Sequence, residues 1–215
     1  MGGAHLRVAT LLWDPNPNSR HFSRCYDESW VEKLHAGFRR NLTVPFTFVC
    51  YTDRPRPLSD DIVQKIISAK TPTYADCLQP YEMGVPMILV GLDTLIIGNI
   101  DHLAEYCLKR QPKNALALPR DPYAKHQACN GVALVPEGYQ CVWRQRRPGF
   151  DDMEEVRRWA HVYIDDLWPG QVISWKGEEV FQKGPGEARI VYFHGNPKMH
   201  EVAPGNPVIE EHWRL

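Results

Sequence analysis

Two short polar stretches, far apart in the chain, carry the residues whose types and spacing could do chemistry. Asp93 follows the apolar run 87–90 after a glycine and a leucine. His194 ends a second apolar run, and Gly195 and Lys198 lie in the turn that follows it. A carboxylate and a neutral imidazole are common metal ligands, whereas a lysine beside a glycine turn suits a phosphate. These residue types together suit a metal ion and a phosphate-bearing ligand.

Each stretch also has a purely structural explanation. Asp93 could be a turn aspartate that accepts hydrogen bonds from its own backbone. His194 and Lys198 could be an ordinary histidine and an incidental lysine around a Gly–Pro turn. A lone acid between buried strands is costly unless something positive meets it, so a buried Asp93 would need a cationic partner. Neither stretch decides between the two explanations by itself.

The elements that position these residues follow from apolar runs and from helical spacing. Strands are expected over 6–13, 44–52, 62–67, 87–90, 94–97, 115–118, 129–135, 171–175 and 189–194. Helices are expected after a cap at Asp27, with apolar spacing over 30–42, and over 101–110 and 151–162, while 71–84 is irregular or a short helix. This alternation of strands and helices predicts an α/β fold.

Composition and charge limit the class of protein. The chain has 215 residues, 43% of them hydrophobic, and a net charge of -1, which fits one domain over 1–215 and gives no reason to expect binding of nucleic acid. The six cysteines form no Cys-x-x-Cys pair, so a zinc site is not expected. A reduced, cytoplasmic setting is expected. No apolar run is long enough for a transmembrane segment, and strand-like sequence from Leu6 leaves no signal peptide.

The two polar stretches, taken in order, resemble the GT-A nucleotide-sugar glycosyltransferases, and most closely the glycogenin-like retaining family. That family has Asp-x-Asp after a central strand, an Asn-x-Gly strand, and His-Phe-x-Gly-x-x-Lys-Pro-Trp near the C-terminus. The corresponding stretches here are Gly91-Leu92-Asp93, Asn130-Gly131-Val132 and Phe193-His194-Gly195-Asn196-Pro197-Lys198. Two departures are Gly91 in place of the first acid and Met199-His200 in place of Pro-Trp.

The resemblance implies a single GT-A-like domain with a mixed, mostly parallel central sheet flanked by helices. Asp93 and His194 would bind a divalent metal, with Mn²⁺ preferred over Mg²⁺ because one ligand is nitrogen. Gly195 and Lys198 would bind the donor diphosphate. Weaker candidates for contacts to the donor nucleotide or sugar are Thr10, Asp53, Leu92, Asp121 and Asn130.

Some of these weaker candidates have structural alternatives. Asp53 could cap the turn that follows its strand, Asn130 could supply a turn, and Asp121 could form a surface ion pair with Arg120. No base or nucleophile can be named from the sequence.

The function implied by the resemblance is that of a metal-dependent, hexosyl-type glycosyltransferase. It would move a sugar from a nucleotide-diphosphate donor, a UDP-sugar above all, to a glycan, lipid or protein acceptor. Because Gly91 replaces an acid, the alternative is a protein of the same fold that binds a nucleotide sugar but does not catalyse its transfer. A nucleotidyltransferase and a Rossmann oxidoreductase are disfavoured, since the loop 14–19 after the first strand has no glycine.

Overall fold

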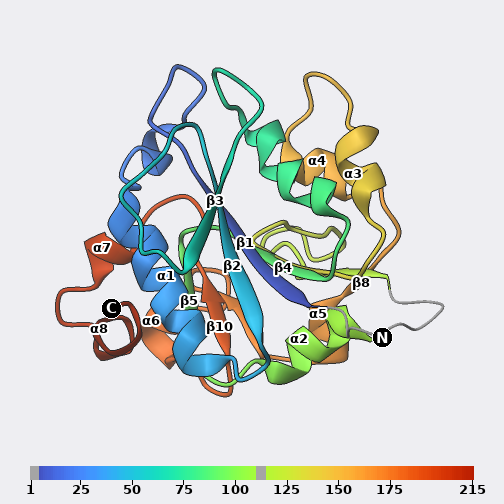
Figure 1. Ribbon diagram of the computed structural model, residues 1–215. Coiled ribbons are helices and arrows are strands. Elements are labelled where there is room, and N and C mark those ends of the chain that lie inside the picture. The colour runs from blue at the N-terminus through green and yellow to red at the C-terminus, as the bar shows by residue number, and fades with distance from the viewer. Residues whose placement is uncertain (1–4, 110–114) are drawn as a thin grey trace.

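A seven-stranded sheet forms the centre of the computed structural model, which describes residues 5–109 and 115–215 (Figure 1). Its strands are β1 (Leu6–Leu12), β2 (Phe46–Thr52), β3 (Ile62–Ile66), β4 (Met87–Val90), β6 (Leu116–Leu118), β7 (Val132–Val135) and β8 (His161–Tyr163). They lie in the order β3-β2-β1-β4-β7-β6-β8. The strands β1 to β4 are parallel, and β7 runs antiparallel to its neighbours β4 and β6. The predicted α/β fold with a mixed, mostly parallel sheet is therefore confirmed.

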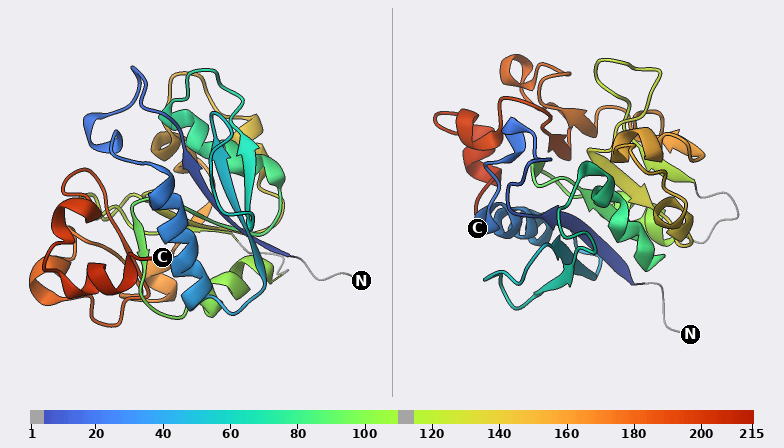
Figure 2. Two further views of the ribbon diagram at one scale, coloured as in Figure 1. Left: turned by 60° about the vertical axis from the view of Figure 1, so that its left-hand side comes forward. Right: turned by 90° about the horizontal axis from the view of Figure 1, so that it is seen from above.

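Helices flank this sheet on both sides (Figure 2). The α-helices are α1 (Glu28–Asn41), α2 (Asp101–Leu108), α3 (Gln140–Arg144), α4 (Asp152–Val156), α5 (Ile164–Leu167), α6 (Val180–Lys183), α7 (Met199–Val202) and α8 (Pro207–His212). Two 3-10 helices are η1 (His21–Ser23) and η2 (Tyr74–Met83). Within the described ranges, none of the helices has both the length and the hydropathy needed to cross a membrane.

The helix α1 forms as its sequence predicts. The Asp27 carboxylate accepts a hydrogen bond from the Ser29 backbone N–H at 3.0 Å, which satisfies one of the unpaired donors of the first turn. Its apolar face is buried in the main hydrophobic core, where Leu34 and Phe38 are at most 2% exposed. Burying such a side chain contributes about 1.5–3 kcal/mol, so packing fixes α1 against the sheets more than helix propensity does.

A smaller sheet brings the two polar stretches together. It consists of β5 (Thr94–Ile96), β9 (Val172–Ser174) and β10 (Ile190–Tyr192), in the order β5-β10-β9. The strands β5 and β10 are antiparallel, with Tyr192 opposite Thr94. One residue further, the Phe193 N–H donates to the Asp93 carbonyl at 2.8 Å. The start of β5 and the end of β10 are therefore adjacent, although they are far apart in sequence.

The second half of the chain differs most from the sequence-based expectation. The predicted helix over 151–162 is wrong, because α4 ends at Val156 and residues 161–163 form β8, parallel to β6. The predicted strand over 129–135 is regular only from Val132, since the preceding residues line a pocket. The helix expected over 101–110 is α2, and Arg110 lies outside the described residues.

Candidate functional site

A pocket of about 430 Å³ lies at the carboxyl ends of β1 and β4. Its wall also includes the residues before β7, the start of α4 and the turn after β10. The polar side chains that line it include Asp93, Asn130, Asp152, His194 and Lys198. Open α/β sheets bind ligands at this edge, and a volume of this size holds a small molecule. The structure therefore brings the two predicted stretches into one concave site.

Asp93 meets a positive partner, as its buried position requires. The Lys198 ammonium forms an ion pair with Asp93 Oδ2, and the Tyr26 hydroxyl donates to the same oxygen at 2.9 Å. The Lys198 side chain is 2% exposed and that of Asp93 is 15% exposed. Burial, and then the Asp93 charge, raises the pKa of Tyr26 well above its usual value, so Tyr26 stays a neutral donor.

The backbone around Lys198 fixes its side chain at the site. Lys198 is the residue directly before α7, and its backbone N–H donates to the carboxylate of Glu201. Its ammonium lies 5.0 Å from the centre of the Phe22 ring, at cation–π distance. Gly195, at the start of the same turn, has φ of 56°, a conformation that favours glycine. The turn thus presents a buried ammonium and a backbone without a side chain to the pocket.

His194 is oriented by one ring nitrogen and leaves the other free. Its Nδ1 lies 3.1 Å from the Ser174 hydroxyl, and its Nε2 is buried without a hydrogen-bond partner among the described residues. Burial, and then the charge of Lys176, lowers the pKa of His194, so the imidazole is neutral at pH 7. A neutral imidazole with a free nitrogen can accept a ligand's hydrogen bond or bind a metal.

Asp152 is the site residue that sequence reasoning missed. Its carboxylate lines the pocket and accepts a hydrogen bond from Asn130 Nδ2 at 2.8 Å, while Asn130 Oδ1 has no partner among the described residues. Burial raises the pKa of Asp152 to about 6, helped by the neighbouring charge of Asp151. Asp151 alone is enough to cap α4, because it accepts the Glu154 N–H. The acid that follows it, Asp152, is not needed for the cap, and this is the sequence signal that could have identified it as a site residue.

The weaker candidates divide into two groups. Leu92, Asp121 and Asn130 line the pocket, whereas Thr10 and Asp53 do not. The Asp121 carboxylate is already held by Arg157 at 3.0 Å and by the N–H groups of the following turn. Thr10 is fully buried within β1, and its hydroxyl has no partner in the described part of the chain.

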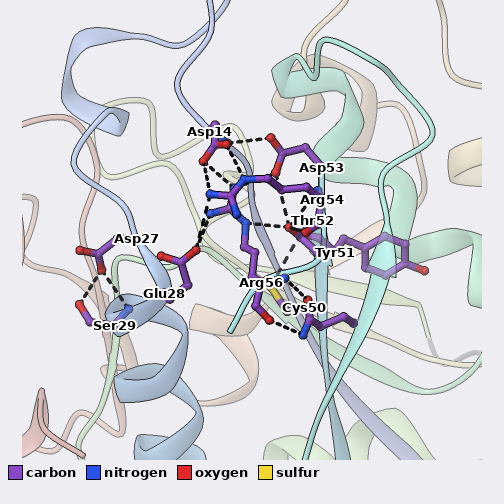
Figure 3. A network of polar contacts seen from close by, with 11 residues as sticks. Asp14, Asp27, Glu28, Ser29, Cys50, Tyr51, Thr52, Asp53, Arg54 and Arg56 are labelled. Atoms are coloured by element: carbon purple, nitrogen blue, oxygen red, sulfur yellow. Dashed lines mark hydrogen bonds and ion pairs between the residues drawn. The ribbon is translucent and has the colours of Figure 1, made fainter. Parts of the chain in front are cut away.

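Asp53 belongs to a charged network beside the pocket (Figure 3). The buried guanidinium of Arg56, 2% exposed, pairs with Asp53 at 2.7 Å, Asp14 at 2.9 Å and Glu28 at 2.9 Å. The half-exposed Arg54 also pairs with Asp14. Its hydrogen bond is the main reason why the pKa of Asp14 falls to about 2. This network ties the ends of β1 and β2 to the start of α1. It holds the rim of the site in place.

The described residues do not fit a resident divalent ion well. They contain no cluster of three or more His, Cys, Asp or Glu side chains that could hold a metal. The Asp93 carboxylate already has two donors, and Gly91 supplies no ligand. The free Nε2 of His194 is the one feature that suits a metal. Hard divalent ions prefer several oxygen ligands, so the Mn²⁺ dependence stays a prediction of the sequence.

His194 does not occupy the position of the histidine in the family motif. Counted back from Gly195 and Lys198, that histidine corresponds to Tyr192, two residues before His194. Tyr192 lines the pocket, but its hydroxyl lies 3.5 Å from Cys129 Sγ and donates weakly to the Arg120 carbonyl. Burial raises the pKa of Tyr192 far above its usual value, so it is a neutral phenol and a poor metal ligand.

Comparison with known proteins gives a clear answer on fold. No protein-family model matches the chain, and no curated protein matches its sequence. Among solved structures, it is similar to the galactosyltransferase LgtC in complex with donor and acceptor sugar analogues, with TM-score 0.57 and 9% identity over 95% of this chain and 94% of LgtC. It is also similar to the glycosyltransferase GlyE of Streptococcus pneumoniae TIGR4, with TM-score 0.56 and 12% identity over 92% of this chain and 56% of GlyE.

A further similar structure is the bifunctional glycosyltransferase WbbM, with TM-score 0.58 and 9% identity over 91% of this chain and 47% of WbbM. At these identities the likeness speaks for the fold, and it covers nearly all of this chain. The chain therefore has the GT-A-like fold of glycosyltransferases.

Proposed function

We propose that this protein transfers a sugar from a nucleotide-diphosphate donor to an acceptor hydroxyl. The observation that carries the proposal is the buried Lys198 ammonium beside the Gly195 turn, in the ligand-binding pocket of a GT-A-like fold. A buried cation next to an accessible backbone turn suits a diphosphate. LgtC was solved with donor and acceptor sugar analogues, which supports a two-substrate site of the same kind here.

The chemistry requires charge stabilisation at the leaving group. When the bond between the sugar carbon and the diphosphate oxygen breaks, negative charge develops on the phosphate. The acceptor oxygen forms the new bond to the sugar carbon, and its proton passes to the departing diphosphate. Lys198 would stabilise that charge as it develops, which is where electrostatic catalysis is most effective, and its position in the pocket lining supports this role. A divalent ion, where bound, would supply the same kind of stabilisation.

Two further side chains of the pocket, Asp152 and Asn130, suit the sugar. The carboxylate of Asp152 and the unpartnered Oδ1 of Asn130 are hydrogen-bond acceptors in a site with few other free polar groups. Sugar hydroxyls donate to such oxygens. The ionised Asp152 would also stabilise positive charge on the sugar carbon in the transition state. We therefore assign Asp152 and Asn130 to the donor sugar, with a UDP-sugar as the donor implied by the family resemblance.

A second candidate is a protein that binds the nucleotide sugar without turnover. The glycine at position 91 and the ion-paired Asp93 favour it, because both reduce the acidic ligand set expected of an active site. Both functions need the same pocket, so they differ only in whether the bound sugar is transferred.

A thermal-shift panel of UDP, GDP, ADP, CDP and TDP tests the shared claim. Ligand at about 100 times its dissociation constant adds roughly 2.7 kcal/mol of stability, which is about 5–11 °C for a chain of this size. A shift with one nucleotide supports a donor site and names the base. Release of that nucleotide from its sugar conjugate then supports transfer, and binding without release supports the second candidate. No shift with any nucleotide would refute both.

A further inference from the structure

We propose that two lysines, Lys198 and Lys176, hold the donor diphosphate in place of a divalent ion. The inference rests on the proposed function, because it concerns how the same site binds the donor. It departs from the Mn²⁺ dependence that the family resemblance implies. Three features of the site carry it: the partner of Asp93, the position of Lys176 and the space around Gly91.

The first feature is that Asp93 is already paired with a cation. Its Oδ2 accepts from the Lys198 ammonium and from Tyr26, so a metal would have to displace both donors from that oxygen. Lys198 is held at Asp93 by its own backbone position at the start of α7. An ammonium has three donors, and Lys198 can therefore keep its bond to Asp93 while donating to a phosphate oxygen.

The second feature is a further cation without a neutralising acid. Lys176 Nζ donates to the Asn196 carbonyl, and it lies 3.3 Å from the point that a Cβ on Gly195 would occupy. No carboxylate in the described part of the chain forms an ion pair with Lys176. Burial, and then the charge of Lys198, lowers the pKa of Lys176, so the two cations act on each other. Two ammonium groups therefore lie at the Gly195 turn, and Asp93 pairs with that of Lys198.

The third feature is the missing first acid. A Cβ at Gly91 would lie 2.8 Å from Asp93 Oδ1, so the Asp93 carboxylate points across the space where a second acid would begin. The turn after β4 therefore supplies one carboxylate, Asp93, where the Asp-x-Asp motif supplies two. Two ammonium groups carry the same charge as one divalent ion.

A divalent ion would also be repelled at this site. It would lie beside two ammonium groups, one of them already paired with Asp93, and like charges repel more strongly where water is excluded. A diphosphate brings the opposite charge and relieves the repulsion between the lysines. The geometry therefore favours binding of the anion alone over binding of a metal complex.

The test is calorimetric titration of UDP, GDP, ADP, CDP and TDP into the wild-type protein, in EDTA and in Mn²⁺. For the nucleotide that binds, we expect dissociation constants within about threefold of each other in the two buffers. We expect Lys198→Ala to weaken binding by at least about tenfold, without rescue by Mn²⁺, and Lys176→Ala by about three- to tenfold. The matched control is Lys183→Ala, which removes an exposed lysine that pairs with Glu179. This variant should bind as the wild type does.

The outcomes separate the inference from the proposed function. Binding that needs Mn²⁺, with a loss of at least about tenfold in EDTA, would overturn the lysine pair and leave the donor site intact. No binding in either buffer would refute the proposed function and the inference together. Because Lys198→Ala leaves Asp93 unpaired, its fold is checked by thermal unfolding. Lys176→Ala breaks no ion pair, and unchanged binding by this variant would also contradict the proposal.

Discussion

Asp152→Asn should make the protein more stable at neutral pH while it lowers donor turnover. The pKa of Asp152 rises from 3.8 to about 6 because the carboxyl is buried in the pocket. The folded state therefore binds this proton more tightly than the unfolded state does. Stability from this group is fully present below pH 3.8 and is lost as the pH rises through about 6.

The magnitude follows from the difference between the two pKa values. At roughly 1.4 kcal/mol for each pKa unit, the ionised Asp152 costs up to ~3 kcal/mol at pH 7 and under about 1 kcal/mol at pH 4. The figure is an upper limit, since the pocket is open to water on one side. Asparagine keeps the shape of the side chain and removes the charge. The variant should therefore melt up to about 6–12 °C higher than the wild type at pH 7.

The assay is denaturant unfolding of both proteins at pH 7 and pH 4. We expect the difference in unfolding free energy to be largest at pH 7 and to shrink at pH 4. The matched control is Asp151→Asn, because Asp151 is the adjacent acid and accepts the Glu154 N–H at 2.9 Å as a helix cap. Asparagine also caps helices well, so this control should change stability by less than about 1 kcal/mol at pH 7.

A destabilised Asp152→Asn protein, or a gain in stability that is equal at the two pH values, would show that burial of the Asp152 carboxylate does not cost stability in this way. The first result would mean that the carboxylate makes a favourable contact in the folded state. The second would mean that its titration does not differ between the folded and unfolded states.

Two further predictions concern ion pairs. Arg56→Ala should destabilise the protein by about 3 kcal/mol in denaturant unfolding, because it leaves three carboxylates without their shared buried partner. Arg54→Ala, which removes the outer, half-exposed arginine, should destabilise the protein much less than Arg56→Ala does, and equal losses for the two variants would contradict the assignment. Asp93→Asn should cost about 3 kcal/mol by leaving Lys198 buried and unpaired, and adding Lys198→Met should recover much of that loss. A double variant that is less stable than Asp93→Asn would show that the two side chains do not act as a pair.

The sequence was sufficient for much of the fold because local patterns and tertiary structure agree there. The run 87–90 is apolar throughout, as a central strand must be, and the structure has β4 at these residues. The helix after Asp27 has a cap and one apolar face, and α1 begins at Glu28. In both places the local sequence pattern indicated the same type of element, strand or helix, that the structure has.

The region 151–163 could not be predicted in this way. Its acids at the start and arginines further on are typical of one longer helix, yet α4 ends at Val156. The strand β8 exists because its backbone pairs with β6, with Val162 opposite Ala117. Pairing of this kind depends on a partner far away in sequence, which local propensity does not report.

The candidate site was predictable in its location more than in its contacts. The need of Asp93 for a positive partner followed from its buried surroundings, and the structure supplies Lys198. The family resemblance assigns Lys198 to the diphosphate and Asp93 to a metal, but it does not show that the two residues bind each other. Asp152 was hidden because a first-turn acid is explained by the helix dipole alone.

The most direct test of the donor site is release of nucleoside diphosphate from sugar nucleotides, measured for the wild type and for Lys198→Ala. We expect the wild type to release the diphosphate from one sugar nucleotide, and Lys198→Ala to lower the rate by about 10²–10³-fold, because one charge at the leaving group is lost. Equal rates for the two proteins would rule out this role of Lys198, and no release combined with no nucleotide binding would rule out the donor site.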